Sequence, residues 1–92
     1  MKGFRYKRSI PVAYDRQGFI YFLTRRYAEL TASERKLIRR IAEKAVGEHK
    51  DALMEYITTG ADQIEVCTKH FLSESTLERC VRRFYIAFDK CM

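Results

Sequence analysis

The side chains of this 92-residue chain that could do chemistry gather near its C-terminal end. Hydroxyl and guanidinium groups recur there at a spacing that puts them on one face of a helix over residues 74–89: Ser75, Arg79, Arg82 and, to one side, Arg83. The opposite face carries apolar residues at i, i+4, i+7 and i+11, which predicts a buried stripe: Leu77, Val81, Phe84 and Phe88. The polar face is either an ordinary solvated helix surface or a binding surface, and the flanking segment favours the second.

The residues before this helix indicate how it would be positioned. Ile64, Val66 and Cys67 are the apolar positions of a short helix, and about four residues, 70–73, then form a turn. Ser73 suits the N-cap of the next helix because its hydroxyl can accept a hydrogen bond from a backbone N–H of the first turn. A short helix, a tight turn and a second helix with an exposed polar face form the helix-turn-helix pattern.

At these residues the chain resembles a known family. LSESTLERCVRRF, residues 72–84, resembles the turn and recognition helix of small bacterial helix-turn-helix regulators. With MEYITTGADQIEVCTKH, residues 54–70, it is similar to sporulation regulators of the stage III D type and to the DNA-reading region of sigma factors. The resemblance implies a sequence-specific transcriptional regulator, of bacterial, phage or mobile-element origin, that inserts helix 74–89 into the major groove of double-stranded DNA. RNA polymerase or another protein is a further partner that it leaves open.

The resemblance also implies roles for individual residues. Arg79 and Arg82 would meet base edges, where bidentate contact with guanine is the common mode. The other three candidates would contact phosphate: Ser75, Thr76 and Arg83.

One position departs from the family pattern in a way that affects the turn. Phe71 stands where these regulators usually have glycine. A left-handed backbone conformation is costly for phenylalanine, so we expect a turn that differs from the usual one or is longer.

Charge is distributed unevenly along the chain. The formal net charge is +6, and residues 1–46 hold twelve basic and four acidic side chains, whereas residues 47–92 hold six and eight. Each phosphate contact releases counterions, so the basic half would supply most of the non-specific affinity for DNA. We expect an N-terminal arm to contribute, although a frayed terminus is the alternative: Lys2, Arg5, Lys7 and Arg8.

The predicted fold class is all-α, with residues 1–92 forming a single helical domain. One proline and four glycines are too few for a turn-rich all-β fold. We divide the chain into a basic arm and turn (1–18), a helical support (19–60) and the helix-turn-helix (61–90). Pro11 makes residues 10–14 extended, and residues 15–18 are either a turn or a helix start capped by Asp15.

Residues 19–30 allow two interpretations. FIYFLT is β-like in composition and could pair with residues 10–14 in a short hairpin. As a helix, the segment has one apolar stripe: Phe19, Phe22, Leu23, Tyr27 and Leu30. We favour the helix.

Two further helices are predicted in the support. Thr31 and Glu34 have the spacing of a capping box, and the helix they open runs to about Val46, where Gly47 stops it. Its inner face would be Leu37, Ile38, Ile41, Ala42 and Ala45. Residues 51–58 form another helix that Gly60 terminates.

Other classes of function lack support. The three cysteines, Cys67, Cys80 and Cys91, match no common zinc spacing, with or without His70, so we expect reduced thiols and no metal. A phosphate-cradling glycine loop and an identifiable nucleophile–base arrangement are both missing, so we expect neither an enzyme nor a cofactor. The longest apolar run, five residues, is far short of the ~20 needed for a membrane span, and we expect a cytoplasmic protein without a signal peptide.

The competing hypothesis is a protein-binding adaptor or inhibitor, from a phage or mobile element, that reuses the helix-turn-helix fold. Its acidic C-terminal half would dock a basic partner. Salt-dependent retention on DNA distinguishes the two hypotheses, because an acidic adaptor surface would show little of it.

Overall fold

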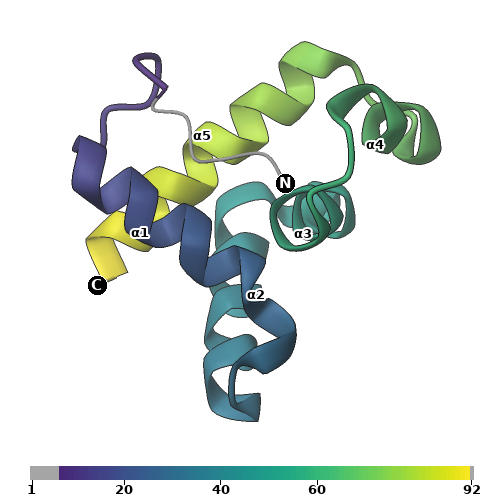
Figure 1. Cartoon of the computed structure of the whole chain (residues 1–92). Helices are drawn as coiled ribbons and strands as arrows, with labels where there is room; N and C mark the ends of the chain where they lie inside the picture. Colours follow the sequence, from purple (N-terminus) through teal and green to yellow (C-terminus); the bar gives the residue numbers. More distant parts are fainter. Residues whose placement is uncertain (1–6, 92) are drawn as a thin grey trace.

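Five α-helices account for most of residues 7–91, the part of the chain that the computed structural model describes (Figure 1). They are α1 (Tyr14–Arg25), α2 (Ala32–Val46), α3 (Lys50–Thr59), α4 (Gln63–His70) and α5 (Glu74–Cys91). Short 3₁₀ turns, Tyr27–Glu29 and Gly47–His49, follow α1 and α2. The described residues contain no strand, so the predicted all-α class is confirmed and the hairpin alternative for residues 10–24 is wrong.

Helix α5 is the central element of the fold. It crosses the molecule from the α4 end towards the C-terminus and contacts each of the other four helices (Figure 1). Its predicted apolar stripe is buried, with Phe84 and Phe88 at most 1% exposed. Fully burying a side chain of this size stabilises the fold by about 1.5–3 kcal/mol, so α5 holds the other helices together.

The apolar side chains form two clusters that α5 connects. The larger cluster joins α1, α2, α3 and α5 and includes Phe84 and Phe88. The smaller one joins α3, α4 and α5: Ala52, Val66, Cys67 and Leu77. It lies beneath the segment predicted as a helix-turn-helix. No helix within residues 7–91 combines the length and hydropathy needed to cross a bilayer.

The ends of α2 follow from local sequence, as predicted. The Thr31 hydroxyl accepts from the Glu34 backbone N–H at 3.2 Å, and the Glu34 carboxylate accepts from the Thr31 N–H at 2.9 Å. Gly47 ends the helix with a φ of 55°, a value that suits glycine. Most of the predicted inner face is correct, but Leu37 is 42% exposed and Val46 is buried instead.

Helix α1 is present but differs from its prediction in extent and in its buried face. It begins at Tyr14, so Asp15 lies in its first turn and is not the N-cap, a position that Ala13 occupies. The buried side chains are Gln17, Ile20 and Thr24, whereas Phe19 and Phe22 are 42% and 47% exposed. Residues 19–23 within this helix are all apolar, so hydrophobic periodicity does not distinguish the buried face from the exposed one.

Gln17 explains why a polar side chain occupies the inner face of α1. Its amide nitrogen donates to the carbonyl oxygens of Lys7, Ile10 and Val12 at 3.0–3.2 Å, and its amide oxygen accepts from the Lys7 N–H at 3.0 Å. A buried amide is tolerated when its hydrogen bonds are made, and Gln17 thereby fixes the segment before α1. Ile10 and Val12 of that segment enter the larger cluster.

Candidate nucleic-acid interface

The turn between α4 and α5 contains a left-handed residue at the position where the regulators that the sequence resembles usually have glycine. Phe71 has φ 57° and ψ 46°, so the expectation of a different or longer turn is wrong. The Leu72 N–H donates to the Cys67 carbonyl at 2.9 Å, a Schellman-type bond that closes the end of α4. Leu72 also packs on the smaller cluster. These contacts offset the penalty of roughly 1–2 kcal/mol for a non-glycine residue in this conformation.

Ser73 caps α5, as predicted. Its hydroxyl accepts from the Thr76 N–H at 3.2 Å, and its carbonyl accepts from the Leu77 N–H at 3.1 Å. The hydroxyl groups of Ser73 and Thr76 are also 2.8 Å apart. The helix therefore begins at Glu74, and it continues to Cys91 rather than to residue 89.

The register of α5 agrees with the sequence pattern. Leu77, Val81, Phe84 and Phe88 are all buried, and the candidate binding residues on the opposite face are all exposed: Ser75, Arg79, Arg82 and Arg83. Thr76 is half-buried, and its hydroxyl is engaged by the cap.

The three arginine side chains of this face have no ionic partner among the described residues. None of the carboxylates there lies within 4.0 Å of their guanidinium nitrogens. The nearby carboxylate of Glu78 instead accepts from the Gln63 amide at 3.4 Å. The guanidinium groups of Arg79, Arg82 and Arg83 are therefore available to a ligand.

The predicted N-terminal arm is only partly described. Lys2 and Arg5 lie outside the described residues, whereas Lys7 and Arg8 are both exposed. The main chain of Lys7 is fixed to α1 through Gln17, and its side chain lies beside Val81 and Tyr85 of α5. The described end of the arm thus runs next to α5, on a different side from Arg79 and Arg83.

An ion-pair cluster that the sequence analysis missed holds α4 against α3. Glu55 of α3 accepts from His70 Nε2 and from Lys69 Nζ, both at 3.1 Å. The hydrogen bonds from His70 and then Lys69 lower the pKa of the Glu55 carboxyl group. These residues are far apart in sequence, so no local pattern indicates their contact.

The cysteines are accounted for by packing. Cys67 and Cys80 are buried, and burial raises the pKa of both thiols, which keeps them protonated. Cys91 is exposed. Within residues 7–91, no three His, Cys, Asp or Glu side chains come close enough to hold a metal ion.

No protein-family model matches the chain, and no curated protein or solved structure is significantly similar to it.

Proposed function

We propose that this protein is a sequence-specific DNA-binding transcriptional regulator that reads the major groove with α5. The observation that carries the proposal is the pair Arg79 and Arg82, exposed and without a carboxylate partner among the described residues. The major groove is about 12 Å wide and admits an α-helix, so such a face could reach base edges.

The roles of the other residues follow from this docking. Ser75 and Arg83 flank the reading pair and would contact phosphate, with Thr76 near the same helix end. Glu74 and Glu78 repel phosphate, so the basic N-terminal half, including Lys7 and Arg8, would supply the non-specific attraction. We extend the proposal to a bacterial cytoplasmic location and to RNA polymerase as an additional partner.

The test compares specific with non-specific binding. A preferred site is first selected from randomised duplexes, and affinity for that site and for random DNA is then measured at one salt concentration. Arg82→Ala should lose about 1–3 kcal/mol on the preferred site and little on random DNA. Arg5→Ala should weaken both about equally, because phosphate contacts carry little sequence information. Arg39→Ala, an exposed arginine on α2, is the matched control and should leave the ratio of the two affinities unchanged.

The salt dependence of the wild-type protein provides an independent check. Neutralising four to six phosphates should give a slope of log K against log salt of roughly −4 to −5. If Arg82→Ala instead weakens binding to the preferred site and to random DNA equally, α5 contacts phosphates and does not read bases.

A flat salt response would favour the protein-binding adaptor instead. One observation supports that second candidate: Ile64 and Phe71 expose 61% and 93% of their surface beside the reading helix. Exposed apolar side chains of this size often mark protein contacts.

A further inference from the structure

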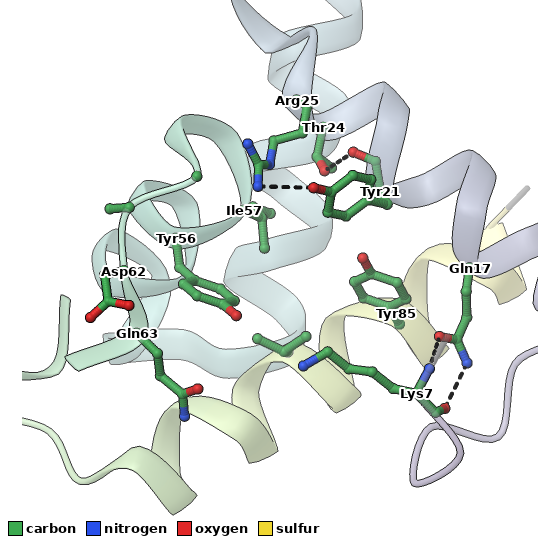
Figure 2. Close-up of a pocket in the computed structure, with 13 residues that line it drawn as sticks. Lys7, Gln17, Tyr21, Thr24, Arg25, Tyr56, Ile57, Asp62, Gln63 and Tyr85 are labelled. Carbon is green, nitrogen blue, oxygen red and sulfur yellow. Dashed lines mark hydrogen bonds between the residues drawn. The ribbon is translucent and has the colours of Figure 1, made fainter. Parts of the chain in front are cut away.

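A hollow between α1, α3 and α5 has the size of a small-molecule site (Figure 2). Its volume is about 500 Å³, within the range of roughly 300–1,000 Å³ that is common for ligand pockets. Three tyrosine rings surround it, one from each helix: Tyr21, Tyr56 and Tyr85. Ile57 and Val81 add aliphatic surface to its wall.

One cation is fixed in position at the edge of the hollow. The Arg25 guanidinium donates to the Tyr21 hydroxyl at 3.0 Å and lies over the Tyr21 ring, 4.9 Å from its centroid (Figure 2). Gly60 makes this placement possible, because a Cβ there would collide with the guanidinium group. Any other residue at Gly60 would also be strained, since its φ is 75°. The surrounding structure thus positions Arg25 before any ligand is present.

A second cation faces the hollow from the opposite side. The Lys7 side chain extends towards Tyr56, while its main chain is held by Gln17 (Figure 2). Neither Lys7 nor Arg25 has a carboxylate within 4.0 Å among the described residues. Asp62 is the one acidic residue of the described lining, and its carboxylate points away from the three tyrosines.

The tyrosine hydroxyls are neutral donors. Tyr85 is only 7% exposed and Tyr56 is half-buried, and burial raises the pKa of both phenols. Neither hydroxyl has a hydrogen-bond partner among residues 7–91. The lining therefore combines aromatic and aliphatic surface with two unpaired cations and two neutral hydroxyl groups.

We propose that this hollow binds a small aromatic carboxylate, with its ring against the tyrosines, Ile57 and Val81, its carboxylate on the Arg25 guanidinium group, and the Lys7 ammonium group attracting that carboxylate from across the hollow. Aromatic rings pack favourably against one another at centroid distances of about 4.5–7 Å, and charge-assisted hydrogen bonds fix the orientation of an anion. The site shares Lys7 with the basic arm but lies apart from the arginine face of α5, and binding of the carboxylate does not depend on the proposed DNA-binding function.

The test uses the full-length protein with 2-naphthoate as the probe and 2-naphthalenemethanol as its neutral counterpart. Titration calorimetry should show saturable one-to-one binding of the acid, and the alcohol should bind about tenfold more weakly because it lacks the charge-assisted bonds. Arg25→Gln and Lys7→Gln should each weaken naphthoate binding about tenfold and leave the alcohol unaffected. Arg39→Gln on α2 is the matched control and should bind both probes as the wild type does.

Several results would overturn the proposal. These are the absence of saturable binding, equal affinity for the acid and the alcohol, or the same loss with Arg39→Gln as with Arg25→Gln. If Arg25→Gln lowers the melting temperature strongly, Lys7→Gln decides, because Lys7 is exposed and its replacement leaves the core intact. Unchanged naphthoate affinity in that variant would then refute the site. Changes in the NMR chemical shifts of the Tyr56 and Tyr85 ring protons on addition of naphthoate show whether it binds in this hollow.

Discussion

Phe71 is the described residue whose backbone conformation and exposure are least suited to its side chain. It is a bulky apolar side chain that is 93% exposed, and it holds a left-handed backbone conformation that favours glycine. Residues in costly conformations persist where the surrounding structure determines them, and they concentrate at functional sites. Phe71 lies in the turn before α5, the helix that we propose to read DNA, so its exposed ring would be placed to contact DNA or a protein partner.

Replacing Phe71 by glycine should therefore stabilise the fold. Phe71→Gly relieves the left-handed penalty of about 1–2 kcal/mol but adds chain entropy to the unfolded state, for a net gain of about 0.5–1 kcal/mol. Urea unfolding measures this change. Phe71→Ala should show no such gain, because alanine carries the same backbone penalty. A less stable glycine variant would mean that the phenylalanine ring makes stabilising contacts.

At the scale of elements, α4 depends on contacts with α3. It has eight residues, too few for a helix that is stable alone, and its N-cap Asp62 makes no side-chain hydrogen bond. Val66 and Cys67 bury its inner face, and Glu55 of α3 binds Lys69 and His70 in its last turn. The orientation of α4, and with it the position of the turn, thus relies on Glu55.

This dependence predicts an acid-sensitive component of stability. The pKa of Glu55 is lowered in the folded protein, so its contribution is present at neutral pH and is lost as the pH falls through the folded-state pKa. Glu55→Gln should lower the melting temperature at pH 7, and the difference from wild type should shrink below about pH 4, near the ordinary pKa of glutamate. The control is Glu65→Gln, an exposed residue of α4 without an ion pair among residues 7–91. A pH-independent difference would argue against the ion pairs.

At the scale of the whole molecule, α5 connects the two apolar clusters, because it contributes buried side chains to both. Leu77 near its start belongs to the smaller cluster, and Phe84 further along belongs to the larger one. Both side chains are at most 1% exposed. A perturbation in either cluster should therefore be transmitted along a single helix.

We expect this coupling to appear as one cooperative unfolding transition. Phe84→Ala should cost about 3–5 kcal/mol and Leu77→Ala about 2–5 kcal/mol, through lost burial and the cavities left behind. Unfolding followed by far-ultraviolet circular dichroism and by tyrosine fluorescence should give coincident curves for both variants. Two separate transitions in Leu77→Ala would show instead that the helix-turn-helix unfolds independently of the larger cluster.

The features that were predictable depend on residues close together in the chain. The capping box of Thr31 and Glu34 and the Ser73 cap each join groups three residues apart. The buried and exposed faces of α5 follow from a strong helical periodicity, which is why the exposure of Arg79, Arg82 and Arg83 was predicted correctly.

Other features required the folded chain because they join distant residues. Gln17 is buried on α1 through bonds to Lys7, ten residues away, and Glu55 meets His70 across fifteen residues. Hydrophobic periodicity scores Gln17 as solvent-facing, since it ignores hydrogen bonds that offset the burial of an amide. Likewise, Phe71 adopts the left-handed backbone conformation that glycine favours, because the next residue, Leu72, packs on a cluster formed by three helices. Packing also explains why no carboxylate of the described residues pairs with Arg79 or Arg82, and why Lys7 and Arg25 line the same hollow. Both features depend on distances between residues that the spacing along the chain does not determine.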